Sequence, residues 1–526
     1  MIEDFREYPE NASIHADICI IGAGAAGITI ANELANSSLQ VCVVESGGFE
    51  YEFDTQDLYQ VENIGIARYP AIAMRLRYFG GTTNHWDGRC SPLNKIDFEQ
   101  RSWVPYSGWP ITSNDLEPFY RRAVAICDLG DFNYGSGVLD EFDIPNPELD
   151  PEKLDCQVWK FSPPTRFGGK YREILDKSYN IKVLLHANVT NIQACAAATC
   201  IEHVDISTLA GKKGKIIAKR FILCCGGIEN ARILLLSNSV QKQGLGNNYD
   251  LVGRFFMEHL RSKDTVVFLK DPYSIKRIFN HYENNTGKYL LGLRMSEAAQ
   301  KSEQVLNAGA MTYFEGSQDS ATHSAANIYD KLKHQQAGNG INKDILNVIS
   351  DLDELIVNMR RKFLRPGSST LINNMTVMVT ETEQAPNPSS RISLSSQRDS
   401  LGLHLTKIDW RLTELDRSTT AVMTRLLASE LGRLYKARVR IPDWKGQFTG
   451  GWQEHFKDVA HHMGTTRMAD NPEIGVVDQN CKVHGIDNLF IAGSSVFPTS
   501  GHVNPTMTIV ALALRLADYI KRTSTS

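Results

Sequence analysis

Residues 17–45 read DICIIGAGAAGITIANELANSSLQVCVVE, and this stretch decides the fold. An apolar run from Asp17 to Ile21 leads into the glycine turn GAGAAG. A helical, alanine-rich segment follows, and a second apolar run ends at Glu45. The order strand, glycine turn, helix, strand is the opening unit of a doubly wound nucleotide-binding sheet. The sequence therefore predicts an α/β class with a Rossmann-like domain.

The glycine turn also predicts a ligand. Gly22, Gly24 and Gly27 form a GxGxxG motif, and Glu45 ends the second strand 23 residues after Gly22. Such glycines permit a tight turn and close approach to a pyrophosphate, while the acid accepts a hydrogen bond from a ribose hydroxyl. A purely structural turn would explain the spacing but not the acid. The motif indicates a dinucleotide and leaves FAD and NAD equally open.

The bulk composition narrows the class of protein. A chain of 526 residues usually divides into two domains, and a net charge of −4 without a basic cluster does not indicate a nucleic-acid binder. The acidic amino terminus lacks the pattern of a signal peptide, so we expect a cytoplasmic protein. The apolar segment 509–520 contains Arg515 and Asp518 and is too short to span a membrane. It is predicted to be a buried helix.

The cysteines and the middle of the chain add organisation rather than chemistry. Ten cysteines are scattered without a CxxC pair or a zinc or iron-sulfur spacing, so we expect no metal site and mostly buried thiols. Ser113 or Asn114 is expected to cap a helix that ends near Gly130. Residues 320–365 look helical and residues 371–410 rich in strands. An apolar strand that meets Gly226 and Gly227 and then a helix indicates a return to the first sheet.

The carboxyl-terminal part contains the candidate chemical groups. Residues 461–468 read HHMGTTRM, and a strand-like NLFIAG leads to a helix predicted to begin near Pro505. Asn504 before Pro505 has an ordinary explanation, because asparagine is a good N-cap and proline a good first helical residue. The helix start would also direct positive partial charge at whatever precedes it.

Several motifs together resemble the glucose-methanol-choline oxidoreductase family. The resemblance runs from about residue 17 to about residue 520 and is based on GAGAAG with Glu45, GGTTNHW, FILCCGGIENARILLLS, VGRFFMEHL, PNPSSRISL, HHMGTTRM and NLFIAGSSVFPTSGHVNPT. HW in the glycine loop and the asparagine partner resemble the pyranose-oxidising branch most. The resemblance implies an FAD enzyme with a second domain built on an antiparallel sheet with helices.

The resemblance also implies the domain boundaries. We expect the FAD-binding domain to comprise residues 1–95, 180–262 and 456–526, and the substrate-binding domain residues 96–179 and 263–455.

The family pattern further implies the roles of individual residues. The base maps onto His461, three residues before Gly464, and its partner onto Asn504, 43 residues later. His462 and His502 are candidate substrate contacts, although His462 is better explained as a packed histidine on the turn. The implied FAD contacts are Gly22, Gly24, Ala25, Gly27, Glu45, Gly81, Thr82, Asn84, His85, Trp86, Val189, Cys225, Gly226, Gly493, Asn504, Pro505 and Thr506. Non-covalent FAD is favoured over a covalent bond through His85.

The predicted reaction is oxidation of a hydroxyl group of a sugar or sugar-like polyol, with hydride transfer to the flavin. The alternative substrate is an amino sugar or a glycosylated natural product. A more remote alternative is an NAD(P)H-dependent flavoprotein, although neither a redox CxxC nor a second nicotinamide motif is present. The electron acceptor (oxygen, a quinone or a redox partner) stays open.

Overall fold

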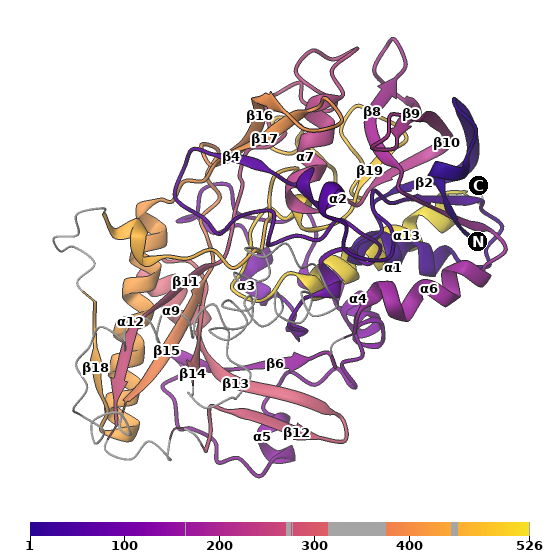
Figure 1. Ribbon diagram of the computed structural model, residues 1–526. Helices are drawn as coiled ribbons and strands as arrows, with labels where there is room; N and C mark the ends of the chain where they lie inside the picture. Colours follow the sequence, from indigo (N-terminus) through magenta and orange to yellow (C-terminus); the bar gives the residue numbers. More distant parts are fainter. Residues whose placement is uncertain (164, 270–274, 276, 314–374, 443–450, 525–526) are drawn as a thin grey trace, which may run out of the picture.

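The computed structural model describes residues 1–163, 165–269, 275, 277–313, 375–442 and 451–524 (Figure 1). Within these residues the chain builds an eight-stranded, largely parallel sheet, an eight-stranded antiparallel sheet and a small third sheet. In Figure 1 the parallel sheet lies at the upper right and the antiparallel sheet at the lower left.

The first sheet is Rossmann-like. Its strand order is β1-β7-β3-β2-β10-β9-β8, with β19 beside β10. The pairs from β1 to β10 and the pair β10–β19 are parallel, whereas β9 and β8 join as an antiparallel hairpin. The strands are β1 Ile2–Asp4, β2 Ala12–Ile21, β3 Val41–Val44, β7 Ile181–Leu185, β8 Asn188–Ala194, β9 Ile201–Ser207, β10 Lys213–Leu223 and β19 Leu489–Ile491.

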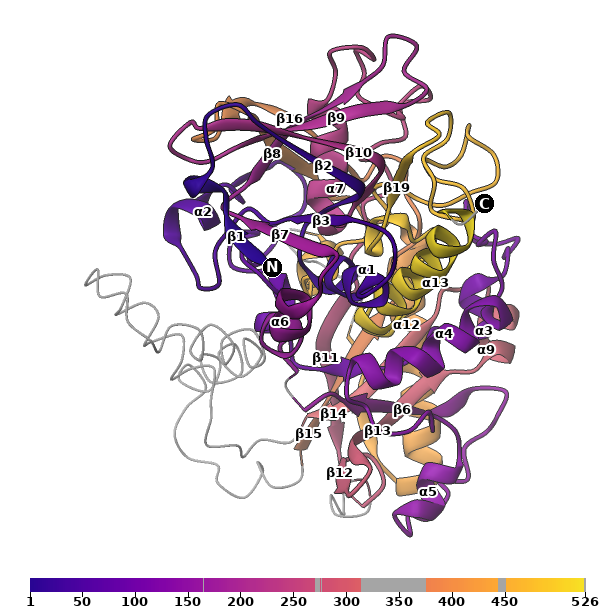
Figure 2. The same ribbon diagram turned by 90° about the vertical axis from the view of Figure 1, so that its right-hand side faces the viewer.

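The apolar runs of the parallel strands explain why this sheet is buried on both faces. Every residue of β3 is buried, as are the last four of β2, because helices cover the sheet. The helix α1 (Ala25–Leu34) packs against α13 (Thr506–Ser524), which packs in turn against α4 (Ser113–Ile126), as Figure 2 shows. α13 contains the apolar segment 509–520, and most of its residues are buried, which confirms the prediction of a buried helix.

The second sheet is antiparallel throughout its described strands. Its order is β18-β11-β15-β14-β13-β6-β5, with β12 beside β13, and α12 (Glu414–Tyr435) packs on it. The strands are β5 Arg89–Cys90, β6 Leu154–Phe161, β11 Leu260–Phe268, β12 His281–Asn284, β13 Gly287–Met295, β14 Ala308–Tyr313, β15 Met375–Thr382 and β18 Arg438–Arg440. A parallel nucleotide-type sheet beside an antiparallel sheet with helices confirms the predicted fold class.

The remaining elements are a third, smaller sheet and short helices. A three-stranded sheet has the order β16-β17-β4. Its strands are β4 Val61–Asn63, β16 Arg391–Arg398 and β17 His404–Asp409, and the other helices are α2 Phe53–Asp57, α3 Lys95–Phe98, α5 Gly137–Glu141, α6 Phe167–Lys177, α7 Gly226–Leu236 and α9 Glu297–Glu303. The 3-10 turns are η1 Phe5–Glu7, η2 Gly81–Asn84, η4 Trp452–His455 and η5 Ser494–Val496.

The predicted ends of α4 were wrong. Its N-cap is Thr112, whose hydroxyl accepts from the backbone of Asp115 while the Asp115 carboxylate accepts from the backbone of Thr112. This reciprocal pair fixes the start one residue earlier than expected. The helix ends at Ile126, because Asp128 and Gly130 then take positive φ angles of 53° and 75°.

The remaining sequence predictions have different outcomes. The helical segment predicted at 320–365 lies outside the described residues, and the domain boundaries stay a prediction. All ten cysteines lie in the described part and are free thiols, six of them buried. No described helix is long and apolar enough to cross a membrane. Nor does any group of three potential ligands among the described residues form a metal site.

Candidate active site

A cavity of about 350 Å³ extends from the glycine turn to the histidine turn. This volume lies within the range of small-molecule sites. Fifteen of the predicted FAD contacts line it: Gly22, Gly24, Ala25, Glu45, Gly81, Thr82, His85, Trp86, Val189, Cys225, Gly226, Gly493, Asn504, Pro505 and Thr506. The two others, Gly27 and Asn84, do not line it.

Gly27 and Asn84 support the backbone around the cavity. A Cβ at Gly27 would lie 1.9 Å from the carbonyl oxygen of Gly22, so only glycine fits where the helix crosses the turn. The Asn84 amide donates to the carbonyl of Phe79 at 2.9 Å and thereby fixes the loop that carries His85. Both residues therefore shape the cavity wall without being part of it.

The glycine turn fits a dinucleotide. Gly22 has φ +101°, a backbone conformation that favours glycine. At Gly24 a Cβ would meet no atom within 4 Å, so the space beside this residue is open to a ligand. Gly24 is the N-cap of α1 and gives no side-chain cap, which leaves the first N–H groups available for an anion.

Glu45 is held in place by the same turn. One carboxylate oxygen accepts from the backbone of Ala23 at 2.9 Å, and the other from Gly47 at 3.2 Å. Burial raises the pKa of Glu45 above its ordinary value. A carboxylate has about four acceptor positions, so Glu45 retains the capacity to accept from a ribose hydroxyl.

The loop before β5 contributes aromatic walls. The indole of Trp86 donates to the carbonyl of Thr165 at 2.9 Å, which fixes its ring. His85 is 4% exposed, and its Nδ1 has no hydrogen-bond partner among the described residues. Burial lowers the pKa of His85 to about 3, so its imidazole is neutral at neutral pH. A neutral ring with an unpaired nitrogen on the cavity wall fits contact with a bound cofactor.

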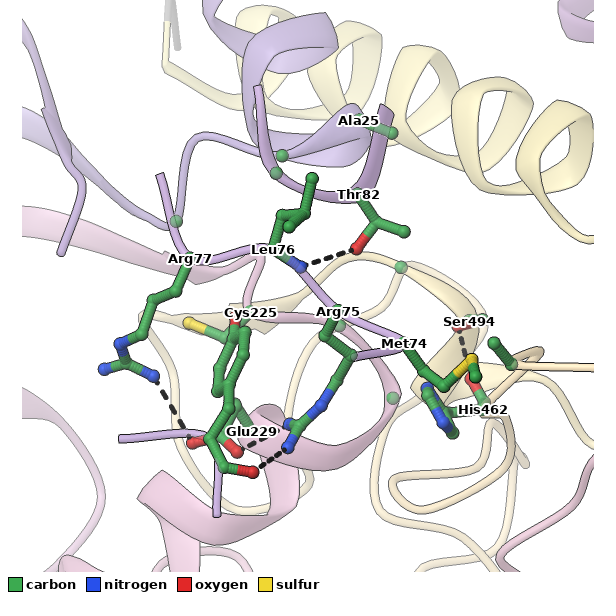
Figure 3. A pocket seen from close by; sticks show the side chains of 18 of the residues that line it. Ala25, Met74, Arg75, Leu76, Arg77, Thr82, Cys225, Glu229, His462 and Ser494 are labelled. Atoms are coloured by element: carbon green, nitrogen blue, oxygen red, sulfur yellow. Dashed lines mark hydrogen bonds and ion pairs between the residues drawn. The ribbon is translucent and has the colours of Figure 1, made fainter. Parts of the chain in front are cut away.

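A charged cluster on the same wall was missed by the sequence analysis. The Glu229 carboxylate lies 2.7 Å from Arg75, 3.7 Å from Arg77 and 3.2 Å from Arg232, and Figure 3 shows the first two arginines converging on it. Burial acts to raise the pKa of Glu229, but the three guanidinium groups lower it to about 2. The three-residue spacing of Glu229 and Arg232 in α7 was the available signal.

The histidine turn is held by backbone contacts on both sides. Met463 exchanges two backbone hydrogen bonds of 3.0 Å with Met257, and the Ser494 hydroxyl donates to the carbonyl of His462 at 2.7 Å (Figure 3). Gly464 has φ +85°, and a Cβ there would lie 2.3 Å from the carbonyl of Phe255. A Cβ at Gly227 would lie 2.1 Å from the carbonyl of His462. Two close approaches therefore require glycine.

His461 and Asn504 meet on the cavity wall, as the family pattern implied. The amide nitrogen of Asn504 lies 3.3 Å from Nε2 of His461, and the Glu258 carboxylate accepts from the backbone N–H of His461 at 2.7 Å. Enclosure in the protein lowers the pKa of His461 well below its ordinary value, and neighbouring His259 lowers it further. His461 is therefore neutral at neutral pH. Asn504 Oδ1 is buried and has no partner among the described residues.

Further polar and charged residues surround this pair, and no motif of their own predicted them. Nδ1 of His259 lies 2.8 Å from Nδ1 of His461. The buried carboxylate of Glu381 pairs with Arg89 at 2.9 Å and with Nε of Arg261 at 3.0 Å. His259 belongs to the run VGRFFMEHL, which was noted only as part of a resemblance.

Comparisons with known proteins agree with this geometry. Residues 386–513 match the family model described as GMC oxidoreductase. The fructose dehydrogenase large subunit of Gluconobacter japonicus is 22% identical over 97% of this chain and 98% of its own length. The 2-methyl-1,2-propanediol dehydrogenase of Mycolicibacterium austroafricanum is 24% identical over 96% and 95%, and the 6'''-hydroxyparomomycin C oxidase of Streptomyces lividus 24% over 95% and 90%.

The chain is similar to GMC oxidoreductases through residues 386–513. The formate oxidase of Aspergillus oryzae shares the fold of this chain, with a TM-score of 0.55, 17% identity and coverage of 98% of this chain and 100% of that chain. The enzyme acts on CH–OH groups and uses FAD, which the glycine turn, Glu45 and the unpaired His85 nitrogen fit. The near-full-length relatives are diverse, so the finer assignment to the pyranose-oxidising branch is not supported.

The two remaining candidate histidines lie in different places. His462 lines the cavity, stacks on Phe256 with ring centroids 6.1 Å apart, and has Nε2 3.3 Å from a Glu258 oxygen. His502 is fully buried and does not line the cavity. Its ring packs edge-on against Trp159, with centroids 6.3 Å apart, and a Cβ at Gly309 would lie 2.5 Å from it. His502 therefore packs against β6 and β14, outside the cavity.

Proposed function

We propose that this enzyme oxidises one hydroxyl of a sugar or sugar-like polyol to a carbonyl, with His461 as the base and Asn504 as its partner. The observation that carries the proposal is the 3.3 Å approach of Asn504 Nδ2 to Nε2 of a neutral His461, on the wall of the cavity that contains the glycine turn.

The acidity of alcohols decides how the base works. An alcohol has a pKa near that of water, ~15.7, against ~6.5 for imidazole, so forming free alkoxide would cost roughly 9 pKa units or ~13 kcal/mol. His461 therefore accepts the hydroxyl proton while the hydride leaves the carbon that bears this hydroxyl group. No stable alkoxide forms. FAD, when bound, supplies the hydride acceptor.

Asn504 and the start of α13 assist His461. With its Nδ2 beside His461 Nε2, Asn504 can donate to the substrate oxygen whose proton His461 removes. Pro505 and Thr506 line the cavity where α13 begins, and the positive end of that helix stabilises negative charge there.

Two observations bear on the substrate. Relatives named for fructose and for a diol cover nearly the whole chain, which supports a neutral sugar or polyol. The relative named for 6'''-hydroxyparomomycin C supports an amino sugar as the alternative.

Anaerobic mixing with a substrate panel tests the proposal. The purified holoenzyme is mixed with neutral sugars, polyols, a simple diol and amino sugars while the flavin absorbance is followed. Rapid bleaching by neutral sugars or polyols is expected, with oxygen or a quinone then added to identify the acceptor. Bleaching by amino sugars alone would favour the alternative, and bleaching by none of these compounds would overturn the proposal.

We further propose that FAD is held without a covalent bond, by non-covalent contacts with the glycine turn, Glu45 and the other residues that line the cavity. Acid precipitation should then release all of the flavin into the supernatant. Flavin that stays with the protein, and with a peptide containing His85, would contradict this.

A further inference from the structure

We infer that His259 and the carbonyl of Ser500 set the tautomer of His461, so that its basic nitrogen faces the cavity. The inference rests on the proposed role of His461 as base. His259 is a positioning residue in this arrangement, because it acts on His461 and does not line the cavity.

The backbone explains why the two rings meet. The segments around Met257 and Met463 run antiparallel and exchange two hydrogen bonds, and a further bridge joins Arg261 to Lys457. Two residues after Met257 on one segment and two residues before Met463 on the other, His259 lies opposite His461. Side chains two residues apart on a strand point to the same face, so the cross-strand neighbours can touch. Their ring centroids are 5.0 Å apart, in an edge-on arrangement.

A chain of donors and acceptors fixes the protons. Nε2 of His259 lies 3.2 Å from the Ser500 carbonyl oxygen, which can only accept, so this nitrogen carries the hydrogen. In a neutral ring Nδ1 of His259 is then an acceptor. Nδ1 of His461, 2.8 Å away, must therefore donate to it. Nε2 of His461 is left with a lone pair.

The far side of His461 agrees with this assignment. Its Nε2 faces the Asn504 amide nitrogen, which is a donor, at 3.3 Å. The opposite tautomers would set N–H against N–H at Asn504 and a lone pair against the carbonyl oxygen of Ser500. Two such mismatches in an enclosed site are strongly unfavourable, because an enclosed polar group without a partner loses its hydrogen bonds to water and gains none in return. The neutral state itself is favoured because burial lowers the pKa of His259.

The charged side chains that act on His461 come from the antiparallel sheet. The ionised groups that act on His461 are Glu381, Arg89 and Arg261, and they form one buried ion-pair cluster. During the reaction the substrate proton adds to Nε2 of His461, and the Nδ1 hydrogen stays in its bond to His259. His259 neither gains nor loses a proton.

Two substitutions at one position test the inference. His259→Asn places an amide oxygen near the position of Nδ1 and an amide nitrogen as donor, whereas His259→Leu removes both functions. We expect His259→Leu to slow flavin reduction by about tenfold to hundredfold, the usual effect of losing a group that orients a functional histidine. KM, FAD content and Tm should change little. His259→Asn should recover most of the rate.

A double variant and a spectrum make the test specific. Combining His259→Leu with His461→Ala should slow reduction no more than His461→Ala alone, because both act through one ring. In ¹⁵N-histidine NMR, the His461 signal, identified by its loss in His461→Ala, should be that of a ring protonated at Nδ1, and His259→Leu should shift it towards a tautomer mixture. His484→Leu, which removes a partly buried histidine bonded to the carbonyl of Ala469, should leave that signal unchanged.

The outcomes separate this inference from the proposed function. If no alcohol bleaches the wild-type flavin, the proposed function fails, and the NMR spectrum still reports the tautomer. If alcohols bleach the flavin but the leucine and asparagine variants reduce it at equal rates, or if His461 is protonated at Nε2, the tautomer relay is refuted.

Discussion

The glycine turn at 22–27 and the histidine turn at 461–464 line one cavity but perform their work with different atoms. At the glycine turn the backbone does the work, since Gly24 leaves space and α1 offers its N–H groups. At the histidine turn side chains do the work, and the partners of His461 lie 43 and 202 residues away in sequence. A site made of backbone can be recognised in a short stretch of sequence, whereas a site made of side chains is assembled by the fold.

The sharpest test of the backbone site is Gly27→Ala. Its Cβ would lie 1.9 Å from the Gly22 carbonyl, so we expect failure to bind flavin and a large loss of stability. The absorbance ratio of flavin to protein and the Tm measure both effects.

Gly24→Ala is the matched variant, because its Cβ meets no atom within 4 Å. It should fold with a Tm close to that of the wild type and still bind FAD more weakly, since the methyl group occupies space meant for the ligand. Gly169→Ala in α6, also free of contacts, should change neither quantity. Equal behaviour of the Gly24 and Gly27 variants would contradict the distinction between ligand space and backbone packing.

The side-chain site is tested by His461→Ala. Loss of the base should slow flavin reduction by ~10² to 10⁴ in anaerobic stopped-flow measurements, with FAD content unchanged. A rate equal to that of the wild type would remove His461 from the mechanism.

Asn504→Ala should have a smaller effect. It removes one hydrogen bond to the substrate oxygen, and a net loss of ~1.5–3 kcal/mol corresponds to about tenfold to hundredfold in rate. The loss should appear in the rate of flavin reduction. A change confined to the substrate concentration dependence would instead place Asn504 in binding alone.

The buried histidines predict how stability depends on pH. Burial lowers the pKa of fully buried His502 to about 3 and lowers that of His259 as well, while both titrate near 6.5 in the unfolded chain. As the pH falls below about 6.5, the unfolded chain binds protons that the folded chain excludes, so stability decreases. His502 contributes a slope of up to ~1.4 kcal/mol per pH unit in this range. Tm measured from pH 7 to pH 5 should fall more steeply in the wild type than in His502→Leu.

The contrast between the two turns also explains what the sequence could predict. The strand, turn and helix at 17–45 were placed closely, because glycine spacing and apolar runs are local signals. The meeting of His461 with Asn504 was anticipated only through the family resemblance. Gly27 and Asn84 were assigned to ligand contact, yet both act on the backbone, a difference that spacing does not encode.

The residues that escaped prediction are those whose partners come from other elements. His259, Glu381 and the cluster around Glu229 have no motif of their own, and their functions arise only when β11, β15 and α7 are brought next to the cavity. Thr112 was missed as the cap of α4 for a local reason. Its reciprocal hydrogen bonds with Asp115 make it a better cap than Ser113 or Asn114.

The approach of Gly227 to the carbonyl of His462, where not even a methyl group fits, locks α7 to the turn that presents His461. The distance between α7 and the histidine turn is thus a property of the scaffold, and a substitution in one of these segments alone cannot adjust it. Changes in which alcohol is accepted must instead come from other residues of the cavity wall.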